Sequence, residues 1–299
     1  MSDTPPIDEP EALADALAPE PAQPGPEVET AVPASEPAEP PAPPLPPAEL
    51  APVPTEKSES WFETFKTIAY ALLIALVIRT FLFQPFNIPT GSMIATLLVG
   101  DYLFVEKFAY GYSRHSFPFS FVPFSGRVFF TEPTRGDVIV FKMPNPNSEH
   151  YMEDYIKRVV GMPGDRIQMI DGVLYINDKA VPKVRVGDYI EHDEFGLERH
   201  VAQFRETLPN GKSYLVLDRG LSEFDNTGVF VVPKGEYFMM GDNRDNSDDS
   251  RGEVRYVPAE NLEGRAELRF FSIDDTAIWY EPWTWPGAIR FSRMFTLID

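Results

Sequence analysis

The chain of 299 residues contains no cysteine, which excludes disulfide bonds, thiolate metal ligands and cysteine nucleophiles. It has only four histidines, His115, His150, His192 and His200, and their spacing is not typical of a metal site. We therefore expect no metal ion and no other cofactor. The lack of thiols is compatible with an oxidising compartment, although cytosolic proteins can lack cysteine too.

Positive charge is also scarce. The chain has 26 basic and 46 acidic residues, which gives a formal net charge of −20. Residues 1–60 account for 12 of these negative charges, because they hold 13 acidic residues and the single base Lys57. A basic surface of the kind that binds nucleic acid is absent, so neither DNA nor RNA is an expected partner.

Residues 1–60 lack aromatic residues and any helical or strand periodicity, and they carry 17 of the 31 prolines. Such a segment cannot bury enough apolar surface to offset the entropy lost on ordering. We predict that residues 1–60 form a disordered, acidic, proline-rich tail.

One segment is apolar enough to cross a bilayer. The run from Thr67 to Ile78 has no charged residue, and a helix extended to Phe86 spans roughly 30 Å, the thickness of the hydrocarbon core. Arg79 lies close enough to the end to reach the interface, and Pro85 would stop the helix. We predict a transmembrane helix over residues 65–86.

Three other interpretations of this segment compete. A cleaved signal peptide is disfavoured because a long tail precedes the segment and no clean A-x-A site follows it. An in-plane amphipathic helix is disfavoured because there is no polar face. A buried helix of a soluble domain stays an alternative, since Lys66 and Arg79 shorten the uncharged run. The few bases around the segment do not determine its orientation.

Residues 87–299 are predicted to form mostly strands. The strongest signal is a hairpin over residues 166–177, in which two alternating runs flank Asp171-Gly172. Further strand candidates lie at 102–107, 137–142, 235–240 and 262–271. We expect an antiparallel β domain with long loops, in which the charged region 183–230 forms an insertion at the rim.

Ser92 is a candidate nucleophile. Pro89 and Gly91 restrict the chain before it, so that a hydroxyl and a backbone N–H could be presented at one point. That N–H and the Thr90 hydroxyl could receive a developing oxyanion. The alternative is that Ser92 only caps a helix that begins at Met93.

Lys157 is the candidate base. Strand alternation puts Tyr155, Lys157 and Val159 on one face, and Ile156, Arg158 and Val160 on the other. A lysine that faces a core is desolvated, which lowers its pKa, and a neutral lysine can take the proton of a serine. The alternative is a lysine whose stem covers apolar surface while its amine stays in water.

The polar loop from Gly241 to Arg251 is the third candidate element. Calcium binding is disfavoured, because the spacing of an EF-hand is not met. Arg244 and Arg251 within the acidic run indicate internal salt bridges. We expect the loop to order its own backbone and to present Ser247 or an aspartate to a neighbour.

Four segments together resemble the ordered boxes of bacterial type I signal peptidase, over roughly residues 65–272. They are Thr90–Met93, Arg135–Phe141, Tyr155–Asp165 and Gly241–Arg251. The resemblance implies a mainly β protein, in which a single N-terminal transmembrane helix precedes an antiparallel β-sheet catalytic domain. One departure is Ala95, which stands where the family usually has proline.

The resemblance also implies roles for individual residues. Ser92 would be the nucleophile that forms an acyl-enzyme, with Lys157 as its general base. The Ser92 amide and the Thr90 side chain would form the oxyanion hole, and Ser247 would orient the lysine amine. The supporting salt-bridge network would comprise Asp249, Arg251 and Arg158. The pockets for small substrate residues would be lined by Phe86, Ile88, Met93, Leu97, Tyr155 and Ile156.

The family's location and substrates are implied in the same way. The protein would be a membrane-bound serine endopeptidase that cleaves signal peptides from exported pre-proteins after small-x-small sites. Its tail would be cytoplasmic, and residues 87–299 would lie on the outer face of the bacterial inner membrane. Its partners would be signal peptides and the lipid bilayer.

Aromatic residues crowd the stretch 117–130, where prolines prevent a regular central strand. One hypothesis is a surface that dips into the bilayer interface, and the alternative is that these side chains fill the core. Trp283 and Trp285 pose the same question. The stretch comprises Phe117, Phe119, Phe121, Val122, Phe124, Phe129 and Phe130, separated by Pro118, Pro123 and Gly126.

Two other functions compete with a signal peptidase. A self-cleaving peptidase of the repressor type shares a Ser–Lys pair, but it predicts an N-terminal DNA-binding domain and a basic face. A catalytically silent, membrane-anchored β domain that binds envelope partners is disfavoured because Ser92, Lys157 and Ser247 are all present.

Overall fold

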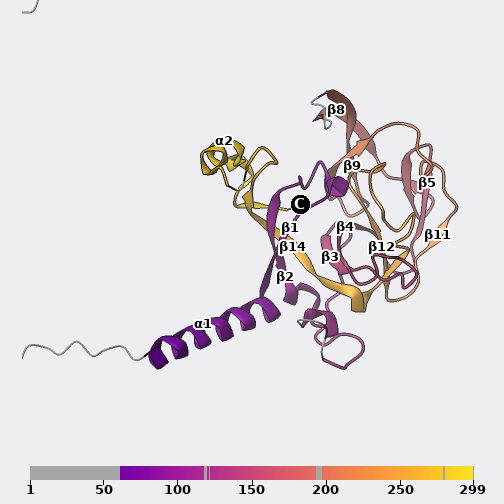
Figure 1. The fold of residues 1–299 in the computed structure, drawn as a ribbon. Coiled ribbons are helices and arrows are strands. Elements are labelled where there is room, and N and C mark those ends of the chain that lie inside the picture. Colours follow the sequence, from indigo (N-terminus) through magenta and orange to yellow (C-terminus); the bar gives the residue numbers. More distant parts are fainter. Residues whose placement is uncertain (1–60, 118–119, 121, 193–196, 279, 299) are drawn as a thin grey trace, which may run out of the picture. The chain divides into compact units, whose positions relative to one another are not determined.

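The computed structural model describes residues 61–117, 120, 122–192, 197–278 and 280–298 (Figure 1). The predicted disordered tail over residues 1–60 lies outside the described residues. So do Pro118, Phe119 and Phe121 of the aromatic stretch.

Helix α1 spans Trp61–Phe81 and exposes nearly all of its apolar side chains. With a mean hydropathy of 1.6, it is the one helix among the described residues that is long and apolar enough to cross a membrane. The predicted bounds of 65–86 differ from those of the helix at both ends, since α1 begins at Trp61 and ends at Phe81. The C-terminal bound was wrong because Phe83–Asn87 forms strand β1, which pairs with β2 (Asp101–Glu106). Pro85, which lacks an N–H, is accommodated because β1 lies at the edge of its sheet.

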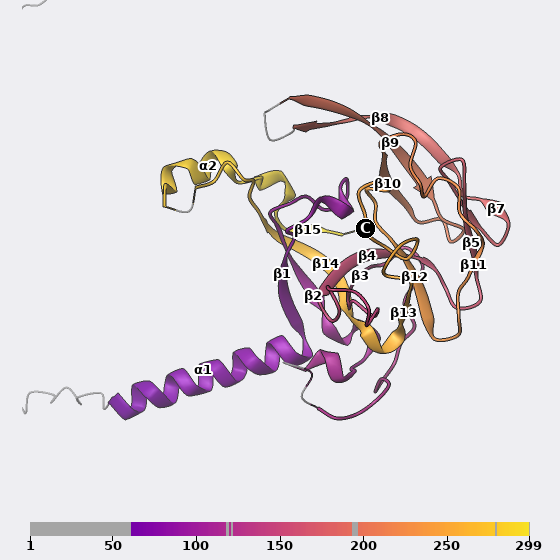
Figure 2. The ribbon, with the colours of Figure 1, turned by 45° about the vertical axis from the view of Figure 1, so that its right-hand side comes forward.

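The main sheet is antiparallel and has eight strands in the order β1-β2-β14-β3-β4-β12-β13, with β15 paired to β14 (Figures 1 and 2). The mainly β, antiparallel fold expected from the sequence is thus confirmed. Beyond β1, the strands are β2 (Asp101–Glu106), β3 (Val138–Lys142), β4 (Asp154–Gly161), β12 (Glu236–Met240), β13 (Tyr256–Pro258), β14 (Leu262–Ser272) and β15 (Thr296–Leu297).

The predicted hairpin over residues 166–177 is confirmed as β5 (Arg166–Ile170) and β6 (Val173–Ile176). Its two turn residues, Asp171 and Gly172, both have positive φ, at 48° and 70°. This backbone suits the tight turn that an Asp-Gly pair favours. The hairpin belongs to a four-stranded sheet in the order β11-β5-β6-β7, completed by β7 (Lys179–Ala180) and β11 (Phe230–Val231).

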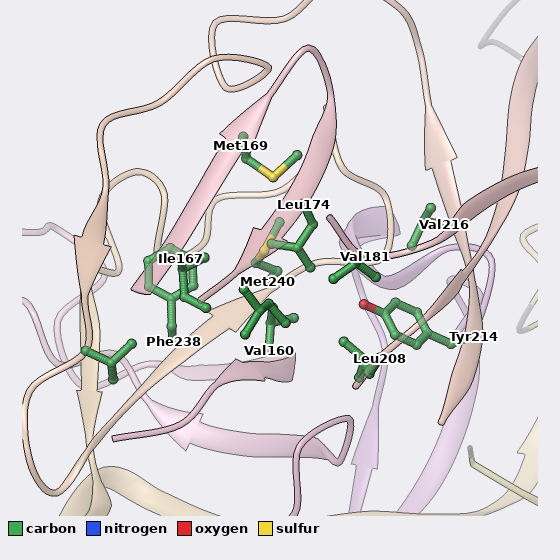
Figure 3. Packing of buried hydrophobic residues seen from close by; sticks show 12 residues of the cluster. Val160, Ile167, Met169, Leu174, Val181, Leu208, Tyr214, Val216, Phe238 and Met240 are labelled. Carbon is green, nitrogen blue, oxygen red and sulfur yellow. The ribbon is translucent and has the colours of Figure 1, made fainter. Parts of the chain in front are cut away.

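The charged region 183–230 contributes a three-stranded sheet of its own, in the order β10-β9-β8. Its strands are β8 (Lys183–His192), β9 (Glu198–Thr207) and β10 (Ser213–Asp218). A buried cluster joins this sheet to the others: Leu208, Tyr214 and Val216 pack with Val160 of β4 and Met240 of β12 (Figure 3). The region is therefore packed onto the main sheet through a shared core.

Strand β4 brings the candidate base to the middle of the main sheet, between β3 and β12. Lys157 lies opposite Ile139 of β3, and Arg158 lies opposite Met240 of β12. Because Gly241 follows Met240 directly, this register carries the polar loop back to the two basic residues of β4. The remaining regular helix, α2 (Trp285–Ala288), lies near the C-terminal end.

Candidate active site

Ser92 and Lys157, 65 residues apart in the chain, meet in the structure. The Lys157 amine donates a hydrogen bond to Ser92 Oγ at 2.8 Å and another to the Ile156 carbonyl at 3.1 Å. Both side chains are buried. Ser92 lies inside the short 3₁₀ helix Gly91–Met93, so its hydroxyl does not cap a helix as in the alternative interpretation.

The surroundings of Lys157 favour its neutral form. Its side chain is 4% exposed, and burial lowers its pKa to about 8 against the opposing pull of Asp249, Asp248 and Asp242. Among the described residues, none of these carboxylates forms an ion pair with the amine. A proton on Lys157 is therefore held more weakly than on an exposed lysine, and the neutral amine accumulates as pH rises through about 8.

Asn243 holds the turn that carries the nucleophile. Its backbone N–H donates to the Ser92 carbonyl at 3.0 Å, and its side-chain amide donates to the Gly91 carbonyl at 2.9 Å. Sequence reasoning treated the loop as a whole and missed this residue. The signal that could have found it is that the loop, otherwise dominated by charged residues and serines, holds only two amide side chains, Asn243 and Asn246.

Gly241 lets the loop approach the nucleophile closely. A Cβ at this position would lie 2.7 Å from the Ser92 carbonyl oxygen and 2.2 Å from Ser247 Oγ. No side chain larger than hydrogen fits without moving backbone. The glycine thus sets the distance between the loop and Ser92.

Ser247 is near the site but does not make the predicted hydrogen bond to Lys157. Its hydroxyl is buried and has no hydrogen-bond partner among the described residues. Lys157 directs its two hydrogen bonds to Ser92 and to the Ile156 carbonyl, whereas the Ser247 hydroxyl lies against Gly241. A buried, unsatisfied hydroxyl beside a nucleophile is a group available to substrate or water.

The predicted supporting network consists of two separate ion pairs. Arg158 binds Asp242 through two hydrogen bonds of 2.9 and 2.8 Å, and Asp242 also accepts one from Thr96 at 2.5 Å. Arg251 binds Asp249 at 3.0 and 2.8 Å, and Asp249 accepts the Gly241 amide at 3.0 Å. The expectation that Arg158 joins Asp249 and Arg251 in one network was wrong, because the β4–β12 register puts Asp242 nearer.

A cleft of about 550 Å³ opens over Ser92 and Lys157. Of the predicted substrate-contacting residues, Phe86, Ile88, Tyr155 and Ile156 line it, as does Thr90 of the predicted oxyanion hole. Its lining also includes six polar residues that the sequence did not single out as site residues. These are Asn87, His150, Glu153, Asp154, Asn246 and Asp248.

Met93 and Leu97 do not line the cleft. Both are fully buried in a cluster with Ile88 and Leu103, against which Phe86 and Ile156 pack. The prediction that they contact substrate was wrong, because the turn after Ser92 points them into the core. They support the residues that do line the cleft.

Nothing in the described part of the chain resembles a metal centre: no group of three or more acidic or histidine side chains could hold an ion. The site combines a serine hydroxyl, a buried lysine amine and an apolar-walled cleft.

The exposed aromatics divide between two surfaces. In the stretch 117–130, Phe129 is 84% exposed, whereas Phe117 packs edge-on against Phe81 at the end of α1 with ring centroids 5.8 Å apart. Near the C-terminus, Trp283 is 73% exposed, and Trp285 is also exposed although its ring N–H donates to the Ile278 carbonyl. Membrane contact by either surface stays a prediction.

Comparison with known proteins gives one consistent result. A family model described as "Signal peptidase, peptidase S26" matches residues 61–271. The chain is 43% identical over 263 residues to the signal peptidase I of Rickettsia typhi, covering 81% of this chain and 95% of the relative. It is 46% identical over 251 residues to that of Rickettsia conorii, covering 77% and 90%.

Among solved structures, a signal peptidase I from Enterococcus faecalis matches part of the chain. It is 24% identical and matches 45% of this chain and 97% of its own, with a TM-score of 0.26. A score this low says nothing about the fold.

Proposed function

The chain belongs to the signal peptidase family S26, and from this premise we propose that Ser92 and Lys157 are the catalytic pair. As a member of this family, the protein is a serine protease that removes signal peptides from pre-proteins. The observation that carries the assignment of residues is the 2.8 Å hydrogen bond between Lys157 Nζ and Ser92 Oγ in a buried setting.

The proposed reaction begins with neutral Lys157, which accepts the Ser92 proton as Oγ attacks the scissile carbonyl carbon. The Ser92 amide and the Thr90 hydroxyl donate to the oxyanion. Protonated Lys157 then gives its proton to the leaving amine, and the signal peptide stays attached to Ser92 as an ester. Water attacks this ester while Lys157 accepts its proton, and Lys157 then gives that proton to Ser92 Oγ as the signal peptide leaves as a carboxylic acid, which restores the serine and the neutral amine.

The cleft supports a preference for small residues near the cut. Phe86, Ile88 and Ile156 give it an apolar wall, and all three pack against the buried cluster beneath them. A wall fixed in this way leaves little room to adapt to large side chains. We assign to these residues the recognition of the small-x-small motif.

The membrane arrangement is part of the proposal. Helix α1 crosses the bilayer, residues 1–60 lie in the cytoplasm, and the β domain lies on the outer face of the inner membrane. The length and hydropathy of α1 support the crossing. A protease accessibility assay on right-side-out and inverted vesicles tests the orientation, and cleavage of the tail from the outside would overturn it.

The test of the catalytic pair uses the full chain and a pre-protein with a small-x-small site. Ser92→Ala and Lys157→Ala are each expected to lower cleavage by at least about 10³-fold, since members of a catalytic unit fail together. Ser222→Ala, which changes a serine away from the cleft, is the matched control. Retained cleavage in either catalytic variant would overturn the assignment.

A further inference from the structure

A buried ion pair joins the region 183–230 to the polar loop Gly241–Arg251, called the catalytic loop from here on. Glu206 of β9 is completely buried, and its carboxylate accepts two hydrogen bonds from the guanidinium of Arg244, one of them 2.5 Å long from Nη1 to Oε1. Tyr214, directly opposite Glu206 in the β9–β10 register, donates its hydroxyl to the same carboxylate at 3.0 Å. The carboxylate is thereby fully engaged inside the protein.

Backbone hydrogen bonds also connect region 183–230 to the loop. The Leu217 N–H donates to the Asp242 carbonyl at 2.9 Å, and the Arg244 N–H donates to the Leu217 carbonyl at 3.0 Å. The Arg219 N–H donates to the Asp245 side chain at 2.6 Å. The end of β10 and the residue that follows it therefore fix the first half of the loop at three positions, Asp242, Arg244 and Asp245.

That half of the loop is the part that reaches the catalytic pair. Asn243, between two residues anchored by region 183–230, binds the carbonyls of Gly91 and Ser92. Asp242 binds Arg158, whose guanidinium lies 4.1 Å from the centre of the Tyr214 ring. Tyr214 thus contacts both arginines, and its ring belongs to the shared core (Figure 3).

A buried ion pair is poor evidence for stability but good at fixing one arrangement over its neighbours. The two-point contact between Glu206 and Arg244 is satisfied in only one position of the loop, because a shift breaks both hydrogen bonds inside the protein. That position is the one in which Asn243 holds the Ser92 turn within reach of Lys157.

We propose that Glu206 is a positioning residue for the catalytic pair, acting through Arg244 and Asn243 to fix the Ser92 turn beside Lys157. The proposal rests on the proposed function of Ser92 and Lys157. On this view one contact of region 183–230, the Glu206–Arg244 ion pair, supports the catalytic pair, whereas the rest of the region forms the rim of the domain.

The experiment compares variants of the full chain in detergent, with pre-protein cleavage measured per folded molecule. Glu206→Gln is expected to lower kcat by more than 10-fold with KM changed less than 3-fold, and to move the acid limb of the pH–rate profile by at least half a unit. The matched control is Asp218→Asn, which breaks the Lys183–Asp218 ion pair of the same region without touching the loop. It is expected to leave kcat and the profile unchanged.

A double variant, Glu206→Leu with Arg244→Met, separates positioning from stability. Replacing both charges by apolar side chains removes the unpaired buried charge, so the melting temperature is expected to return to near wild type. On our proposal kcat stays low and the pH profile stays displaced. Recovery of kcat together with the melting temperature would overturn it, as would an unmoved pH profile in Glu206→Gln.

A Ser92→Ala variant, measured alongside, distinguishes failure of the proposed catalytic pair from failure of the positioning role of Glu206. If Ser92→Ala retains cleavage, the assigned catalytic pair fails. If Ser92→Ala is inactive while Glu206→Gln and the double variant both cleave at the wild-type rate, only the positioning role fails.

Discussion

Two regions of the domain each bury a lysine, and they differ in what surrounds its amine. Lys107, below the end of α1, is 1% exposed and forms an ion pair with Glu263 at 3.2 Å. Lys157, in the cleft, is 4% exposed and donates instead to a hydroxyl and a carbonyl. Both lysines are thus buried, so burial alone does not distinguish the proposed base Lys157 from Lys107.

The difference lies in the nearest charge. Burial lowers the pKa of Lys107, and the carboxylate of Glu263, in contact with the amine, offsets only part of that lowering. For Lys157 the carboxylates that oppose desolvation belong to Asp249, Asp248 and Asp242, which bind other partners, and the pKa falls to about 8. A desolvated lysine becomes a base when no carboxylate touches it.

The largest expected effect comes from exchanging each lysine for methionine. Lys157→Met removes the proton acceptor and is expected to lower cleavage by at least about 10³-fold. Lys107→Met removes a lysine of equal burial and is expected to leave kcat per folded molecule within 3-fold. Steady-state cleavage of a pre-protein measures the rate of both variants. Equal losses of rate in the two would contradict the proposed difference between Lys157 and Lys107.

Glu263→Gln tests the structural half of the comparison. It leaves Lys107 buried without its carboxylate and weakens the contact with Lys142 at 3.5 Å. We expect the free energy of unfolding to fall by about 3–5 kcal/mol, while cleavage per folded molecule is unchanged. Denaturant unfolding of the full chain measures the loss. Full stability in this variant would mean that Lys107 does not depend on its partner.

The pH dependence of cleavage tests the catalytic half. Because burial lowers the pKa of Lys157 to about 8, the neutral base accumulates as pH rises. The acid limb of kcat/KM is therefore expected to have its midpoint near 8. An optimum below pH 6 would be incompatible with a neutral lysine base.

The smallest expected effect is a shift of the acid limb of the pH profile of kcat/KM. Asp248 raises the pKa of Lys157, so Asp248→Asn is expected to lower it and to move the limb toward acid by a few tenths of a unit. The effect is small because Asp248 is exposed and its charge is screened by solvent. Glu281→Gln, which removes an acid outside the cleft, is the control. A shift toward alkaline pH would contradict the proposed environment of Lys157.

Much of the site could be predicted because its signals are local in sequence. Asp171-Gly172 specifies its own hairpin, since both residues tolerate the positive φ of the turn. The alternation around Lys157 predicts its side chain on the same face as Val159, and both residues are buried in β4. The C-terminal bound of α1 could not be predicted from the sequence in this way, because the pairing of β1 with β2 competes with helix propensity at residues 83–87.

The partners of the charged residues could not be predicted in the same way. Arg158 could have met any of several aspartates in the loop, and the β4–β12 register chose Asp242 over Asp249. Ser247 lies beside Gly241 without reaching the lysine. Each of these outcomes depends on distances between segments far apart in the chain.

By itself, the sequence determined the class of fold and the apolar helix, because each follows from residues that are close together. It identified Ser92 and Lys157 as candidates through four separate segments that resemble one family. Only the tertiary structure decided which buried lysine lacks a carboxylate, that Asn243 holds Ser92, and that Glu206 reaches the catalytic loop. The physical reason is that desolvation and ion pairing are set by whatever packs against a side chain. For Lys157 those neighbours come from segments at residue 92 and residues 242–249.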